Sequence, residues 1–294
     1  MKIQFFLISL ILLSFINAPY ADADQSQIPA SAVNITTREQ QSIDNENSWW
    51  ARQSKEKKIL YTNLTAVTAI GIWGLSTWDY GSAGLNTSDE GWFEHDSKYG
   101  GADKLGHFWA TYAFSDALTG LYKNWGYDSG KASTYAALSA WTLQFFMEVG
   151  DATSETQGFD WGDMALNSIG ALTSVLFTHY PELDRKIDFR VEYGFNFPVN
   201  GIFDDYSDQY YSLVVKFDGF DVFQNNFLKW VEISGGYYTR GYGDHDEGNV
   251  RSFYAGININ LSRLFYQNGW EKIGKTLEYI QLPYTTLKSS HDLD

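Results

Sequence analysis

The sequence predicts an α+β protein in which a four-helix bundle, either compact or embedded in a membrane, precedes a C-terminal antiparallel β-sheet. Four long apolar segments rich in Gly, Ala, Ser and Thr lie in the first part of the chain, and such small residues let helices approach closely. After Pro181, apolar and polar residues alternate with the period of two that is typical of a β-strand. Hydrophobic residues make up 44% of the 294 residues, which is enough for a sizeable core.

The N-terminal residues have the pattern of an export signal. Lys2 is followed by an apolar run over residues 5–16 and by a small-residue cleavage pattern that ends at Ala23. We expect residues 1–23 to be a signal peptide; an uncleaved anchor is the alternative, although the apolar run is shorter than the roughly 20 residues of a membrane helix. Residues 24–54 are polar and are expected to form a flexible arm.

Residues 55–182 are expected to form the helical bundle, and their charge pattern fits two architectures. The first apolar segment, residues 59–78, contains no charged residue, as in a membrane helix. The uncharged stretches of the third and fourth segments, 132–147 and 164–179, are only about 16 residues long, which favours a compact exported bundle. We favour association with a membrane and keep the compact bundle as the alternative.

Residues 183–282 are expected to form an antiparallel β region with short helices. The run over residues 187–197 places apolar residues on one face and Asp188, Arg190 and Glu192 on the other, so we expect the charged face to contact water. Further strands are expected at 210–220, 229–242 and 251–261, short helices at 222–230 and 262–280, and a loose tail at 283–294.

The composition excludes several classes of protein. A formal net charge of −15 argues against nucleic-acid binding, which needs basic clusters. The absence of cysteine excludes disulfides, thiolate metal sites and a cysteine nucleophile. The 11 Trp and 20 Tyr residues are typical of a protein that contacts a membrane interface or a glycan. We therefore expect a membrane or an envelope lipid or glycan as the partner, and the sequence identifies no protein partner.

Polar side chains gather at three predicted helix ends. Each end carries a pair of residues spaced to share one helix face: Asp103 and His107, Glu148 and Asp151, and Asp160 and Asp163. In an antiparallel bundle the second and fourth helices run in the same direction, and the third helix ends where they begin. Connectivity alone therefore predicts that the three pairs meet at one end of the bundle.

Such a cluster needs a compensating charge, because carboxylates cannot stay ionised and unpaired in a partly dry site. A divalent ion such as Zn²⁺, Mn²⁺ or Mg²⁺ is one solution, and it could activate water for hydrolysis. Without a metal, a carboxylate-paired His107 could act as a general base. The candidate metal ligands are Asp103, His107, Glu148, Asp151, Asp160 and Asp163, and the candidate catalytic residues are His107, Glu148 and Lys104. For ligand bonds of about 2 Å, His107, Glu148 and Asp163 should approach one another within about 5 Å.

Simpler explanations exist for some of these residues. Asp103 and Asp160 would also suit the positive end of a helix dipole, and a single histidine is more often a packed core residue than a ligand. Glu148 and Asp151 have no such explanation, because the dipole disfavours acidic residues at a helix C-terminus. The acidic pair at the helix C-terminus therefore favours a functional site over a purely structural explanation. We do not assign Asp116, His179, His245 or His291 to it, and we interpret residues 243–248 as a solvated hairpin tip.

Three motifs connect the chain with known families. The runs DKLGHF at 103–108, MEVGD at 147–151 and GFDWGDMALNSIG at 158–170 resemble the YfiM-like family of periplasmic proteins, which has no assigned function. Their order is also similar to that in the VanZ-like membrane proteins. The resemblance marks Asp103, Lys104, His107, Glu148, Asp160, Asp163, Asn167 and Gly170 as motif positions without implying a reaction. The chain lacks the lipoprotein cysteine of many YfiM-like members, so the resemblance implies no lipid anchor.

These observations predict an exported protein of the cell envelope, located in the periplasm or associated with a membrane. One hypothesis is a metal-assisted hydrolase or lipid-modifying enzyme with its site at the helix ends. The alternative is a non-enzymatic structural, lipid-binding or glycan-binding protein in which the same polar residues lock the bundle.

Overall fold

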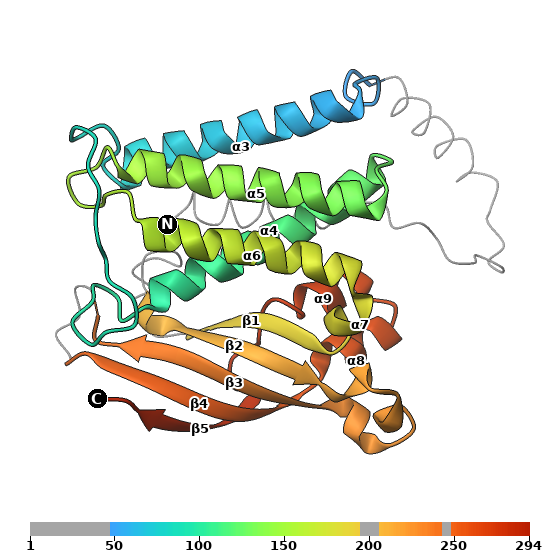
Figure 1. Ribbon diagram of the computed structural model, residues 1–294. Helices are drawn as coiled ribbons and strands as arrows, with labels where there is room; N and C mark the ends of the chain where they lie inside the picture. Colours follow the sequence, from blue (N-terminus) through green and yellow to red (C-terminus); the bar gives the residue numbers. More distant parts are fainter. Residues whose placement is uncertain (1–47, 195–205, 243–247) are drawn as a thin grey trace, which may run out of the picture.

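The computed structural model describes residues 48–194, 206–242 and 248–294. The predicted signal peptide, most of the polar arm and most of the hairpin tip at 243–248 lie outside the described residues. In the described part, a helical layer is followed along the chain by an antiparallel sheet, which confirms the predicted α+β fold (Figure 1).

Four long helices form the first half: α3 (Lys55–Thr77), α4 (Ala102–Asn124), α5 (Ser129–Asp151) and α6 (Trp161–His179). Side-chain caps fix where three of them begin, because Ser54, Asp128 and Asp160 each accept a hydrogen bond from a backbone N–H of the first turn. α3, α5 and α6 lie side by side in one layer (Figure 1). α4 packs against α5 and α6 on one of its sides and against the sheet on its other side.

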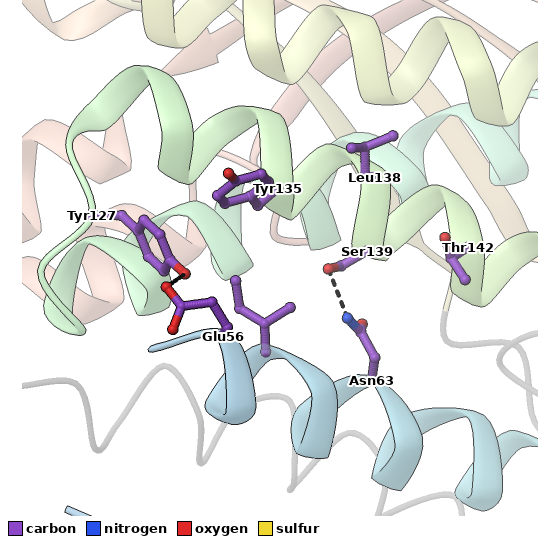
Figure 2. Close-up of a pocket in the computed structure, with 8 residues that line it drawn as sticks. Glu56, Asn63, Tyr127, Tyr135, Leu138, Ser139 and Thr142 are labelled. Carbon is purple, nitrogen blue, oxygen red and sulfur yellow. Dashed lines mark hydrogen bonds between the residues drawn. The ribbon is translucent and has the colours of Figure 1, made fainter. Parts of the chain in front are cut away.

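α3 differs from the other helices in its surroundings. Among the described residues, it is the one helix whose length and composition would allow it to cross a membrane. It packs mainly against α5, and only 11% of its most apolar window is buried. A groove of about 350 Å³ lies between the N-terminal halves of α3 and α5 (Figure 2). Within it, Tyr127 donates a hydrogen bond to Glu56, and Asn63 donates one to Ser139.

The sheet contains β1 (Ile187–Tyr193), β2 (Gln209–Lys216), β3 (Val231–Arg240), β4 (Val250–Ile259) and β5 (Thr286–Asp292), in that spatial order. All neighbours pair antiparallel. The prediction of a loose tail at 283–294 is therefore wrong, since β5 pairs along β4. This segment forms a strand because β4 would otherwise have an unpaired edge. Two side-chain contacts add to the pairing: Ser252 donates a hydrogen bond to Asp292, and Arg251 forms an ion pair with Asp294.

Short helices occupy the connections. α7 (Pro181–Asp184) links the helices to β1, and short 3₁₀ turns replace the helix expected at 222–230. The helix expected at 262–280 is divided into α8 (Leu261–Gln267) and α9 (Glu271–Thr276), because Gly269 between them has a φ of 75° that a helix cannot accommodate.

The expectation that one face of β1 contacts water is wrong, because both of its faces are covered. Phe189 and Val191 on the apolar face pack against the helices, as an apolar face should. Asp188, Arg190 and Glu192, which were expected to contact water, are buried. Residues 279–281 pair alongside β1, and Gln281 accepts a hydrogen bond from Arg190. The apolar face is exposed farther along the sheet, where Ile233, Ile257 and Leu287 lie in one row across β3, β4 and β5. The charged face can be buried because its charges pair: Arg190 with Asp188 and Glu232, Lys216 with Asp188, and Lys288 with Glu192.

A close backbone contact joins α4 to α6. A Cβ atom at Gly170 would lie 2.3 Å from the carbonyl oxygen of Phe108, so a larger residue cannot fit without moving one helix. One turn earlier, buried Thr111 donates a hydrogen bond of 2.7 Å to Asn167. The motif positions Asn167 and Gly170 thus set the distance between the two helices that carry most of the polar cluster.

We predict that Gly170→Ala destabilises the protein by about 1–3 kcal/mol, because overpacking forces α4 and α6 apart. Gly120→Ala is the matched control in α4, since a Cβ atom there meets nothing within 4 Å. It should be neutral or stabilise by up to about 1 kcal/mol through helix propensity. Urea unfolding followed by circular dichroism measures both, and equal midpoints for the two variants would contradict the packing argument.

Candidate functional site

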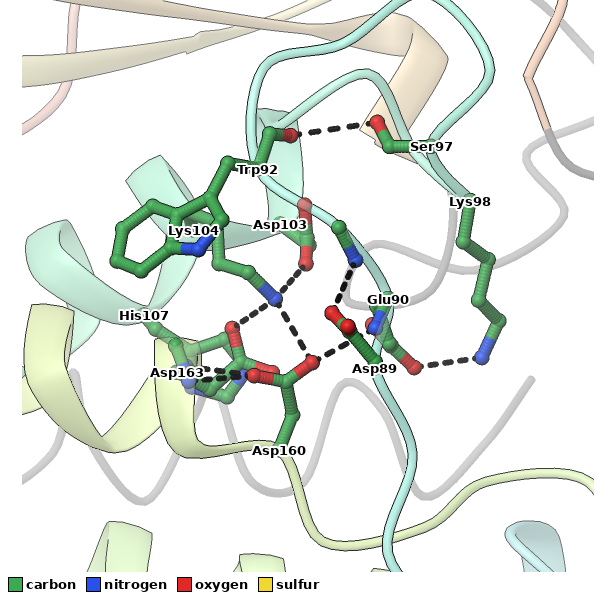
Figure 3. Close-up of polar contacts among 12 residues, drawn as sticks. Asp89, Glu90, Trp92, Ser97, Lys98, Asp103, Lys104, His107, Asp160 and Asp163 are labelled. Carbon is green, nitrogen blue, oxygen red and sulfur yellow. Dashed lines mark hydrogen bonds and ion pairs between the residues drawn. The ribbon is translucent and has the colours of Figure 1, made fainter.

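Three helix ends meet at one end of the bundle, as connectivity predicts (Figure 3). The N-terminal turns of α4 and α6 and the C-terminal turn of α5 contribute the side chains that we call the helix-end cluster: Asp103, Lys104, His107, Glu148, Asp160 and Asp163. Apart from His107, which is partly exposed, all of these residues are buried.

Lys104 is the central cation of the cluster. Its side chain has no solvent exposure, and its Nζ lies 2.8 Å from Asp103, 2.9 Å from Asp163 and 3.3 Å from Asp160. Burial alone would lower the pKa of Lys104, but the charges of Asp103 and Asp163 raise it above its ordinary value. Lys104 therefore stays protonated and holds α4 against the start of α6.

Asp160 fixes the geometry of the site through its backbone and side chain. One carboxylate oxygen caps α6 by accepting from the N–H groups of Gly162 and Asp163, and the other accepts from the N–H of Glu90 at 2.9 Å. Its own N–H donates to Glu148 at 3.0 Å. Burial alone would raise the pKa of Asp160, but the N–H donors and Lys104 lower it, so this carboxylate is ionised.

His107, Glu148 and Asp163 form the open part of the cluster. The His107 Nε2 lies 3.6 Å from a carboxylate oxygen of Asp163 and 3.9 Å from one of Glu148. One donor atom from each of the three residues lies within 4.8 Å of the other two, which confirms the predicted approach. Both His107 separations exceed the range of a hydrogen bond, so the imidazole converges on the two carboxyl groups without donating to either.

The protonation states follow from burial. Burial, with the charge of Asp163, raises the pKa of Glu148 to about 9, and burial raises the pKa values of Asp103 and Asp163 to about 7. Burial also lowers the pKa of His107. At neutral pH the imidazole is therefore neutral, and Glu148 carries a proton unless a cation takes its place.

The structure separates the predicted site residues into groups. Asp103 pairs with Lys104, and Asp151, whose pKa burial raises to about 7, lies outside the two convergent sets found among the described residues. Asp116, on the same helix as His107, instead pairs with Lys275 and accepts a hydrogen bond from Tyr279.

Sequence reasoning missed Glu90, which belongs to a second convergent set with Asp160 and Asp163. Glu90 lies in the connection between α3 and α4 and pairs with Lys98 at 2.7 Å. Helix spacing carries no signal for a loop residue, so only the three-dimensional structure reveals it. The roles of all these residues as metal ligands remain predictions.

Comparison with known proteins agrees with an envelope location. Residues 89–179 are similar to a family described as "Predicted periplasmic lipoprotein (DUF2279)". The matched region contains α4, α5 and α6, hence the whole helix-end cluster, and excludes α3 and the sheet. It supports an exported envelope protein from an uncharacterised periplasmic family, and it confirms neither the YfiM-like nor the VanZ-like resemblance. No curated protein and no solved structure matches the chain.

We predict that Lys104→Met destabilises the protein by about 3–5 kcal/mol, because it leaves buried carboxylates without their cation. Lys98→Met is the matched control: Lys98 also pairs with a carboxylate, but its side chain is 36% exposed, and such pairs contribute about 0–1 kcal/mol. Chemical denaturation compares the two. Similar losses would show that Lys104 is not the electrostatic centre of the cluster.

A second prediction concerns pH in the presence of a chelator. Between about pH 5 and pH 9, folded Glu148 retains a proton that the unfolded chain has released, so stability falls as pH rises. Glu148→Gln removes this term and should make the decline shallower by up to about 1.4 kcal/mol per pH unit. The exposed control Glu155→Gln should keep the wild-type slope. Free energies of unfolding measured between pH 5 and pH 9 give the slope for each variant. A steeper decline with pH in Glu148→Gln than in the wild type would contradict the assigned proton on Glu148.

Proposed function

We propose that the helix-end cluster binds one divalent metal ion through His107, Glu148 and Asp163 and uses it to hydrolyse an ester or phosphoester bond in the cell envelope. The observation that supports this most directly is the spacing of the three donors. A neutral imidazole and two carboxylates converge within 4.8 Å without hydrogen-bonding one another, and metal–ligand bonds of about 2 Å would bridge such separations.

The charged residues around these three donors leave one carboxyl group, that of Glu148, without a cation. Lys104 already pairs with Asp103, Asp160 and Asp163, so it cannot also neutralise Glu148. A metal ion would replace the proton that Glu148 otherwise retains. One nitrogen and two oxygen ligands suit Zn²⁺ or Mn²⁺ better than Mg²⁺, which prefers oxygen alone.

Each residue then has a distinct role. Three protein ligands leave coordination positions for water and substrate, and a bound metal would supply the acidity that activates that water. His107 is the most exposed of the three, with 14% of its side chain accessible, and marks the side from which a substrate would approach. Lys104 has no exposed surface and acts as a positioning residue that contacts Asp163, and its charge opposes the rise that burial causes in the pKa of that carboxyl.

The alternative is a scaffold in which the cluster only locks three helix ends. The deep burial of Glu148 and Asp163 and the full enclosure of Lys104 favour this second candidate. The two candidates differ in one measurable respect, because a scaffold needs no metal.

We predict that the purified chain binds one metal ion and that Glu148→Gln abolishes this binding. Elemental analysis measures the stoichiometry. In thermal melts, excess Zn²⁺ or Mn²⁺ should stabilise the wild type by about 2.7 kcal/mol at a hundredfold excess over Kd, and a chelator should remove this gain. Glu155→Gln, an exposed change near the same helix end, should behave as wild type.

Hydrolysis is assayed with p-nitrophenyl phosphate and p-nitrophenyl butyrate, and a metal-dependent rate that Glu148→Gln loses would support the enzyme. A wild type without metal, insensitive to chelator and no more stable than Glu148→Gln, would leave the scaffold as the function. Bound metal without turnover of either ester would restrict the cluster to metal binding.

A further inference from the structure

The outward surface of the helical layer is apolar. α3, α5 and α6 lie side by side (Figure 1), and each exposes a stripe of large apolar residues. Together we call these stripes the uncharged face: Leu60, Leu64, Ile72 and Leu75 of α3, Tyr135, Leu138 and Phe146 of α5, and Ile169, Leu172 and Leu176 of α6. No charged residue occurs in 59–78, 132–147 or 164–178. Helices that face water carry charged residues on their outer side, so this surface is not suited to water.

α3 cannot be explained as another kind of apolar helix. The core helix of a water-soluble protein would be mostly buried, whereas 11% of the apolar window of α3 is buried. A signal sequence would lie at the N-terminus, whereas α3 begins at Lys55. α4 provides the contrast within the same bundle, because it lies between the helical layer and the sheet and carries Asp116 and Lys123.

Aromatic residues lie at both ends of the uncharged face, and lysines lie at one of them. At one end, Trp50 contacts Trp125 and Tyr61 beside the three lysines of the first turn of α3. At the other end, Trp78 contacts Trp73 and Tyr80. Aromatic side chains favour the boundary between hydrocarbon and headgroups, and lysines are attracted to anionic headgroups.

The second aromatic group adjoins the helix-end cluster. The ring of Tyr80 covers Gly150 of α5, and its hydroxyl donates to the carbonyl of Met147, the residue before Glu148. The cluster thus lies at the level where the uncharged face ends.

We propose that the uncharged face lies in the hydrocarbon of a lipid bilayer, with the helix-end cluster at the level of the lipid headgroups. The partner is the bilayer itself: an apolar surface matches acyl chains, and the aromatic rings at both ends of the face and the lysines at one end match the headgroup boundary. This arrangement does not depend on a metal ion, so its test is independent of the test of the proposed hydrolase activity.

The absence of native cysteine allows a direct test. Leu64→Cys, Leu138→Cys and Leu172→Cys place one thiol on each helix of the face, and Val222→Cys, at a site that is 74% exposed in the β2–β3 connection, is the control. Each full-length variant is labelled with the fluorophore NBD and reconstituted into phosphatidylcholine–phosphatidylglycerol vesicles. Lipids spin-labelled on the acyl chain or on the headgroup serve as quenchers.

We expect blue-shifted emission and stronger quenching by acyl-chain labels at all three face positions, and neither effect at Val222→Cys. Trp161→Cys, 73% exposed between Asp160 and Asp163, should be quenched most by headgroup labels. Chelator and Glu148→Gln should change none of these signals. Face positions that behave like Val222→Cys, protein that stays with the aqueous fraction on vesicle flotation, or thiol cross-linking between copies without quenching would overturn the proposal.

Discussion

One buried ammonium group determines how the helical half is assembled. Three helix ends bring acidic side chains together, and like charges in a dry site repel strongly unless a cation lies between them. Lys104 supplies that cation and contacts one carboxylate of its own helix and two at the start of α6. Asp160 then extends the junction to α5 through Glu148 and to the preceding loop through Glu90. These contacts join the three helix ends that the connectivity of the bundle brings together.

The sheet also pairs its buried charges, through Arg190 and Lys216. Arg190 contacts two carboxylates and Gln281, and Lys216 shares Asp188 with it, so the buried face is a paired network. On the other face, Ile233, Ile257 and Leu287 are exposed, whereas Val191 and Tyr211 are buried beside α4. Both halves of the molecule therefore contain buried charges that are paired, next to apolar clusters that fill the core.

The sequence predicts what depends on local spacing and connectivity. Residues three or four apart share a helix face, and antiparallel helices bring alternate ends together, so the meeting of His107, Glu148 and Asp163 could be predicted. Glu90 could not, because its position depends on a loop. Period two predicted β1 and its buried apolar face, but not the burial of its charged face, since Arg190 finds its partners Glu232 and Gln281 about 40 and 90 positions later. The strand β5 was missed because its polar sequence orders only beside the edge of β4.

The excess of carboxylates at the helix ends can be balanced by a proton or by a metal ion, and the proposed metal site rests on the spacing of the donors. A proton on Glu148 needs one acceptor and is satisfied by a short hydrogen bond. It gives no reason for a neutral imidazole to lie 3.6 Å from Asp163 and 3.9 Å from Glu148, too far to donate to either. A shared ion requires such spacing, because each donor must stand one bond length from a common centre. The position of His107 is thus the observation that carries the proposed metal site, and metal analysis of the purified protein decides between the two ways of balancing the charge.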